Sequence, residues 1–286
     1  MINLILAIIA SSLVSIMMRV GEGRAKNNIS MLSVNYFLCM ILAIIYTGVG
    51  NLMQTGEGLG TAIGLGSING FFYIASLILF QNSVKKNGVV LSSIFMKLGI
   101  MMPLIISILL FGEMPTMVQI IGFVIAVTAI VIINMKEKEE NVTNHKTNRT
   151  SPVKLGLILV LVGCGMADGM SKIYQELGTR EFEELFLVCT FVIAFILSVL
   201  FVKYKKQKYT SNEILYGILL GIPNYYSARF LLKALGEIPA VVAYPTFSIG
   251  TIAVITLTGV VAFKEKLTIR QMFAVGLIAV AVVLLN

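Results

Sequence analysis

The chain has 286 residues, of which 57% are hydrophobic and only 13% are charged, and its net charge is +8. Soluble domains carry about 25% charged residues, so this composition excludes an ordinary water-soluble globule. The apolar residues fall in stretches of about 18–25, long enough to cross roughly 30 Å of hydrocarbon. The composition therefore predicts a membrane protein that crosses the bilayer several times and has no separate water-soluble domain.

Ten apolar stretches follow one another along the chain, and each is expected to be a transmembrane helix. The spans are 2–20, 31–49, 59–80, 88–111, 117–135, 154–175, 185–202, 213–235, 239–263 and 268–285. Helices are expected because an open strand in lipid would leave backbone groups unpaired. The first stretch lacks the basic region of a cleaved signal, so it is read as the first helix. The predicted fold class is an all-α membrane protein.

Lysine and arginine residues gather in alternate loops. The loops after segments 1, 3, 5, 7 and 9 hold 17 of the 22 basic residues, whereas the other loops hold 3. By the positive-inside rule, this asymmetry places the odd-numbered loops in the cytoplasm and both termini outside the cytoplasmic membrane. The same distribution explains the net charge of +8 without a nucleic-acid partner.

The two halves of the chain resemble each other when the sequence is shifted by 152 residues. Phe111, Glu113, Thr116 and Gln119 then coincide with identical residues at 263, 265, 268 and 271. Each half contains five spans, an odd number, so equivalent helices must run in opposite directions. We therefore predict two five-helix inverted repeats at 1–135 and 154–286, joined by a cytoplasmic linker at 136–153. Such repeats typically enclose a binding site near the bilayer midplane.

These features resemble the drug/metabolite transporter superfamily, EamA type. The most specific similarities are the stretch from Pro103 to Gln119 and the stretch from Phe263 to Gln271, which close the two halves. The resemblance implies ten helices around a central cavity that is lined mainly by segments 1, 3, 4, 6, 8 and 9. It also implies that segments 5 and 10 pack together at the side as a scaffold.

Two further stretches resemble the four-helix small multidrug resistance proteins of the same superfamily. Residues 7–23 are similar to their first helix, and residues 243–250 are similar to their Ala-Tyr-x-x-Trp-x-Gly-x-Gly helix. The membrane-embedded glutamate of those exporters is replaced by Ser11, and its counterpart in the second half is Cys164. Phe247 replaces the tryptophan. The resemblance therefore does not carry over the proton-coupled export of cationic drugs.

Three charged residues lie deepest inside the predicted spans, away from their ends, where a charge is costly and indicates function. Lys97 lies about nine residues into segment 4, and Asp168 and Arg229 lie at similar depths in segments 6 and 8. Each has a structural alternative. Lys97 can extend its stem toward the interface, and Asp168 can pair with Lys172 on its own helix or with Arg229 across helices.

Uncharged polar residues at mid-depth are candidates for holding a small polar ligand. Asn69 and Tyr73 lie in segment 3, and Asn224 and Tyr225 follow Pro223 in segment 8. Amides and phenols can bind a polar ligand without the cost of burying a charge. Hydrogen bonding between helices is the alternative for the asparagines. Tyr244, in the stretch that resembles the small exporters, is the last candidate for the cavity.

Enzyme chemistry finds no support in the sequence. The one histidine lies in a polar loop, no Gly-x-x-x-x-Gly-Lys-Ser/Thr sequence is present, and no cofactor or metal ion is expected. We expect a secondary transporter of a small polar or amphipathic metabolite, with an amino acid or organic acid favoured because two of the three buried charges are cations. A flippase of a lipid-linked sugar and an exporter of cationic drugs or metabolites remain alternatives. Protons are left open as a second partner, beside the membrane lipid, and a monomer or weak dimer is expected.

Overall fold

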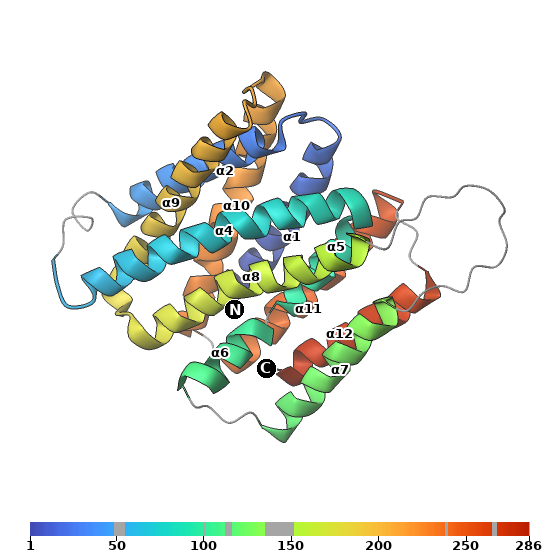
Figure 1. Ribbon diagram of the computed structural model, residues 1–286. Coiled ribbons are helices and arrows are strands. Elements are labelled where there is room, and N and C mark those ends of the chain that lie inside the picture. Colours follow the sequence, from blue (N-terminus) through green and yellow to red (C-terminus); the bar gives the residue numbers. More distant parts are fainter. Residues whose placement is uncertain are drawn as a thin grey trace.

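The computed structural model describes residues 1–48, 55–99, 101–111, 116–134, 152–237, 240–264 and 268–285. The described residues form α-helices and one short 3₁₀ helix, joined mostly by short links (Figure 1). The helices are α1 (Ile2–Glu22), α2 (Asn28–Thr47), α4 (Leu59–Asn87), α5 (Val89–Leu98), α6 (Met101–Phe111), α7 (Met117–Asn134), α8 (Pro152–Leu177), η1 (Arg180–Phe182), α9 (Glu183–Tyr204), α10 (Ser211–Glu237), α11 (Ala240–Val261) and α12 (Ile269–Leu285).

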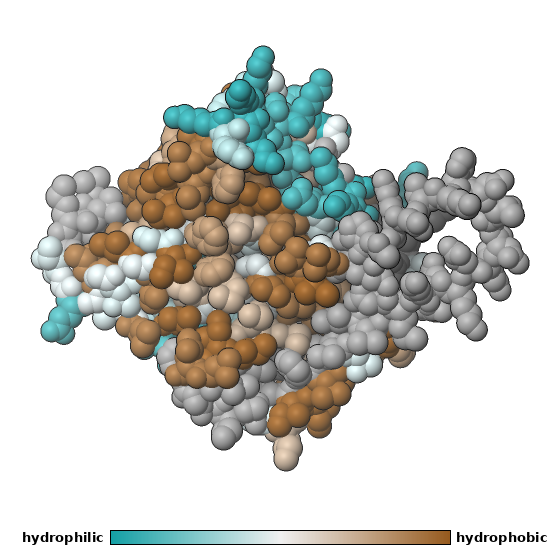
Figure 2. Space-filling model, in the orientation of Figure 1, coloured by the Kyte–Doolittle hydropathy of each residue, from teal (hydrophilic) through white to brown (hydrophobic). Residues whose placement is uncertain are grey.

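This architecture confirms the prediction of an all-α membrane protein. Among the described residues, α1, α2, α4, α8 and α9 are each long and apolar enough to cross a bilayer. Shorter apolar helical stretches lie at 246–261 and 272–281, and α5 with the start of α6 forms a third. Figure 2 shows hydrophobic side chains covering the middle of the molecule, with hydrophilic side chains gathered mainly at its top. The outside of the bundle is therefore matched to hydrocarbon at its middle and to water at an end.

One end of the bundle carries a concentration of basic residues, and we call it the basic end. It is formed by loops 23–27 and 205–210, together with the turn at Gly88 between α4 and α5. Hydrogen bonds tie loop 23–27 to α10, because Glu213 accepts from the backbone N–H groups of Lys26 and Asn27 at 2.9 Å each. Gln207 likewise accepts from the backbone N–H groups of Ile29 and Ser30, at 3.1 Å each. The first turn of α2 is therefore capped by the second half of the chain.

The helix packing is symmetric under exchange of the two halves. Helix α1 packs on α10 as α8 packs on α4, and α2 packs on α10 as α9 packs on α4. The contact of α1 with α11 likewise has its counterpart in the contacts of α8 with α5 and α6. Helices α7 and α12 pack against each other at one side of the molecule, as the resemblance implies (Figure 1). Each half therefore supplies the same set of contact faces. The predicted linker at 136–153 lies almost wholly outside the described residues.

The sequence predicts segment 4 as one helix, and here the structure differs. Helix α5 ends at Leu98, and a separate helix, α6, begins at Met101. The cause is Pro103, which has no N–H and whose ring clashes with the carbonyl four residues earlier, at Gly99. That carbonyl instead accepts from the backbone N–H of Met102, at 2.8 Å. The break follows Lys97 by two residues, so it lies beside the most deeply placed lysine.

Glycines spaced four apart within a helix allow helix backbones to approach closely at three of the four places where such pairs occur. A Cβ at Gly165 would lie 2.4 Å from the Gly99 carbonyl oxygen, one at Gly221 would lie 2.9 Å from the Asn35 carbonyl oxygen, and one at Gly70 would lie 2.5 Å from the Thr190 carbonyl oxygen. Helix contacts in membranes depend on such close packing, because lipid supplies little hydrophobic drive between helices. At the fourth pair, Gly60 and Gly64, an added Cβ would meet no atom within 4 Å, so this spacing serves no helix contact.

Candidate functional site within the helical bundle

Lys97 lies in the last turn of α5, a helix whose other side chains are almost all buried. Its ammonium group does not extend toward the membrane surface. It donates to Ser11 Oγ on α1 at 3.0 Å and lies 3.8 Å from the ring centroid of Phe247 on α11. A cation over an aromatic face is stabilised by the ring's quadrupole. Three helices therefore hold one partly exposed ammonium group roughly 14 Å along the helix axis from the basic end.

The contacts of Ser11 and Phe247 concern the two positions at which the sequence differs from the small multidrug resistance proteins. In the small multidrug resistance proteins, the resemblance implies a cation-binding carboxylate at the position of Ser11. Here the hydroxyl of Ser11 accepts from a cation that the chain itself supplies. Phe247, at the tryptophan position, keeps an aromatic face against the same cation. The centre of the bundle thus carries a positive charge at the place where those exporters carry a negative one.

Asp168 is exposed although it lies on the inward face of α8. Leu157, Leu161 and Cys164 lie eleven, seven and four residues before it, on the same side of the helix, and all three are buried. The lipid-facing stripe of α8, which includes Leu155, is a different face. An exposed side chain on an otherwise packed helix face indicates that the neighbouring helices do not enclose Asp168 completely.

Lys97 and Asp168 interact electrostatically without direct contact. Each charge acts on the other, yet no ion pair joins these two described residues. The hydroxyl of Tyr73, on α4, lies within electrostatic range of the same carboxylate, and its side chain is half-buried. A cation and an anion thus stand apart in one accessible region, with α1, α4, α5, α8 and α11 around them. This group, Ser11, Tyr73, Lys97, Asp168 and Phe247, is called the central site below.

Arg229 belongs to a second group, near the end opposite to the basic end. It forms an ion pair with Glu184 of α9 at 3.2 Å, donates to the Tyr225 hydroxyl at 3.0 Å and lies 3.7 Å from the centroid of the Tyr46 ring. The Tyr46 hydroxyl is in turn bonded to that of Tyr226, at 2.9 Å. The ion pair of Arg229 with Asp168, considered from the sequence, is not formed, because Glu184 at the start of α9 is the nearer acid.

The two predicted asparagines lie in contacts between helices. The Asn69 amide donates to Thr190 Oγ1 of α9 at 3.4 Å, and the Asn224 amide donates to Asn35 Oδ1 of α2 at 3.2 Å. Both asparagine side chains are buried. These positions match the interhelical alternative considered for them. The side chain of the last candidate, Tyr244, lies outside the described residues.

Comparisons with known proteins agree with this architecture. Residues 154–286 match the model of the EamA-like transporter family. The second half of the chain is therefore similar to an EamA-like transporter domain. The matched residues contribute Asp168, Phe247 and the Glu184–Arg229 pair, whereas Ser11, Tyr73 and Lys97 come from the first half. The residues of the central site therefore come from both halves of the chain.

Two relatives extend the comparison over the whole chain. An uncharacterized protein of Haemophilus influenzae is 26% identical over 277 aligned positions, which cover 93% of this chain and 91% of that protein. A protein of known crystal structure is similar with a TM-score of 0.60 and 16% identity, covering 99% of this chain and 94% of that one. The second likeness concerns the fold alone, and it includes both halves of the chain.

Proposed function

We propose that the protein is a secondary transporter that moves a small zwitterionic metabolite, an amino acid in the favoured case, across the cytoplasmic membrane by alternating access. The observation that carries the proposal is the separation of Lys97 from Asp168: two opposite charges lie in one accessible region at mid-depth without pairing. Unpaired opposite charges within a membrane protein are costly, so their retention points to a ligand that satisfies both.

An amino acid has the matching arrangement of charges. Its carboxylate would accept hydrogen bonds from the Lys97 ammonium and the Ser11 hydroxyl, which are already positioned by their own bond. Its ammonium would be held by Asp168, with Tyr73 beside it. An organic acid would use the Lys97 half of this site alone, and it is the next candidate.

Arg229 has a different role in this proposal. Its charge is offset by Glu184, and its guanidinium is covered by the Tyr46 ring. It is therefore not counted as a substrate contact, and the balance of charges at the central site is one cation to one anion. This balance favours a zwitterion over the purely anionic substrate that the count of buried charges in the sequence favoured.

Orientation and direction are also part of the proposal. The positive-inside rule would place the basic end in the cytoplasm and both termini outside. Import and export are equally compatible with a site of this kind, as are coupling to protons and exchange.

The test is transport of a panel of labelled amino acids, organic acids and amines by the purified protein in vesicles. We expect amino acids to be carried, with Lys97→Met and Asp168→Asn each reducing the rate at least tenfold. Lys233→Met is the matched control, since Lys233 is an exposed lysine on α10, and it should transport normally. Transport of amines that is lost in Asp168→Asn but retained in Lys97→Met would instead support a cation exporter. Absence of transport for the whole panel would contradict the proposal.

A further inference from the structure

Two serines continue the polar face of the central site toward the basic end. On α1, Ser15 lies four residues after Ser11, and on α5, Ser93 lies four residues before Lys97. Residues four apart share one helix face. Because α1 ends and α5 begins at the basic end, both serines lie one turn nearer to that end than the bond between Lys97 and Ser11. Helices α1 and α5 pack against each other, and both serines lie on the helix faces that carry the bond between Lys97 and Ser11.

Both hydroxyl groups are buried and, in the described part of the chain, neither has a hydrogen-bond partner. Neighbouring hydroxyls behave differently. Ser12 donates to the Ile8 carbonyl at 2.8 Å, as serines in helices commonly do, and Ser92 is bonded to Ser83 at 2.8 Å. A buried hydroxyl without a partner is unfavourable, so its presence at this depth calls for a reason outside the packing of this conformation.

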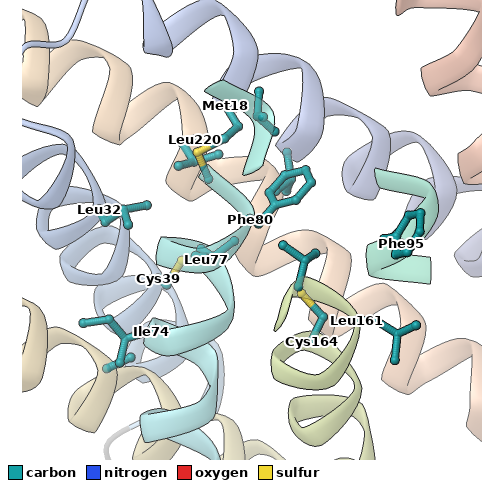
Figure 3. Packing of buried hydrophobic residues seen from close by; sticks show 14 of the residues in the cluster. Met18, Leu32, Cys39, Ile74, Leu77, Phe80, Phe95, Leu161, Cys164 and Leu220 are labelled. Carbon is teal, nitrogen blue, oxygen red and sulfur yellow. The ribbon is translucent and has the colours of Figure 1, made fainter. Parts of the chain in front are cut away.

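The accessible region around Asp168 is closed on the side of these serines. Toward the basic end, the face of α8 that bears Asp168 continues with Cys164 and Leu161, which are buried. Toward the opposite end it continues with Lys172 and Gln175, which are partly exposed. Figure 3 shows Leu161 and Cys164 in the packed core that also contains Phe80 of α4. The central site is therefore reached from the opposite end, while the α1–α5 side is shut.

We propose that Ser15 and Ser93 line the route by which a substrate passes between the central site and the basic end, and that this route is closed in the present conformation. The inference rests on the proposed transport function and adds the path to it. When α5 separates from α1 in the alternate conformation, the two hydroxyls become exposed to water and to the polar groups of the passing substrate. They lack partners here because their partners are present only in that other conformation.

The first experiment measures the accessibility of single cysteines. Cys39, Cys164 and Cys189 are replaced by alanine, and Ser15→Cys or Ser93→Cys is then introduced. A membrane-impermeant thiol reagent is applied from the side of the basic end in the presence and absence of a transported amino acid. We expect both cysteines to react at least tenfold faster during turnover. Ser92→Cys is the matched control, because Ser92 is equally buried but bonded to Ser83, and it should not change.

The second experiment keeps the native cysteines and uses Ser15→Ala and Ser93→Ala. Removal of an unpartnered hydroxyl should leave the thermal stability unchanged, whereas the transport rate should fall several-fold. A loss of stability without an effect on transport would indicate a structural role and overturn the inference. So would labelling of Ser15→Cys and Ser93→Cys no faster than that of Ser92→Cys in a preparation that transports. If no compound is transported at all, the proposed function fails first, and labelling without substrate still decides whether the route opens.

Discussion

The ion pair between Arg229 and Glu184 makes a quantitative prediction about stability. The Arg229 side chain is 10% exposed and that of Glu184 is 32% exposed, so the pair is largely removed from water. Breaking a buried pair by removing one partner costs about 3–5 kcal/mol, because the other charge is left unpaired. The partial exposure of Glu184 reduces this cost, and we expect Arg229→Gln to lower the free energy of unfolding by about 2 kcal/mol.

Glu184 also has one carboxylate oxygen, Oε2, that is buried without a hydrogen-bond partner among the described residues. Loss of Arg229 would leave the remaining oxygen, Oε1, without its ion-pair contact as well, which supports a cost at this level. The loss of the stacking of the guanidinium on Tyr46 contributes about 0.5–1 kcal/mol of this total. For a chain of this size, about 2 kcal/mol corresponds to a fall in Tm of roughly 4–8 °C.

The assay is thermal unfolding of the detergent-solubilised protein, measured for Arg229→Gln, Glu184→Gln and the double variant. The double variant should be more stable than the sum of the two single effects predicts, because it leaves no unpaired charge. Glu176→Gln is the control, since its pair with Lys172 lies near the surface and such pairs contribute about 0–1 kcal/mol. Strictly additive effects in the double variant would refute the claim that Arg229 and Glu184 stabilise each other.

Two other predictions concern packing and capping. Gly165→Val should reduce the yield of folded protein severely, because its Cβ would lie 2.4 Å from the Gly99 carbonyl oxygen, whereas Gly60→Val should be tolerated in open space; size-exclusion profiles of the two variants compare them, and a normal profile for Gly165→Val would contradict the contact. Gln207→Ala should lower the unfolding free energy by about 1 kcal/mol, because it removes an acceptor for two backbone N–H groups of α2. The measurement is the Tm of Gln207→Ala, compared with that of a control variant, Gln175→Ala, at a partly exposed position. Equal Tm values for the two variants would argue against the cap that Gln207 provides for α2.

The helical architecture could be predicted because it depends on long-range averages of the sequence. Ten apolar stretches were predicted to cross the bilayer, and each falls on helix in the residues that the structure describes. The break in segment 4 was missed although its cause is local: Pro103 acts four residues upstream, at Gly99, while the stretch remains apolar throughout. The length of an apolar stretch therefore locates a membrane segment but does not reveal an interruption of the helix inside it.

The site was predicted only in part, because the depth of a residue in a helix does not specify which side of the helix it faces. Lys97, Asp168 and Arg229 were identified as intramembrane charges, but the sequence could not tell that Lys97 and Asp168 interact with each other without pairing and that Arg229 pairs with Glu184. Glu184 was overlooked as a partner because it lies at the edge of a span, where the cost of an acidic residue is low. The one signal in the sequence that pointed to Glu184 was the buried charge of Arg229, which needs an acidic partner.

The most direct test of the account is equilibrium binding to the central site, with three ligands that differ in charge: an amino acid, the matching carboxylic acid without the amine, and the matching amine without the carboxylate. The wild-type protein should bind the amino acid most tightly. Asp168→Asn should remove the preference of the site for the amino acid over the plain acid, and Lys97→Met should remove its preference over the plain amine. Variants that lower the affinity for all three ligands equally, or that leave the order unchanged, would contradict the central claim that one substrate spans both charges.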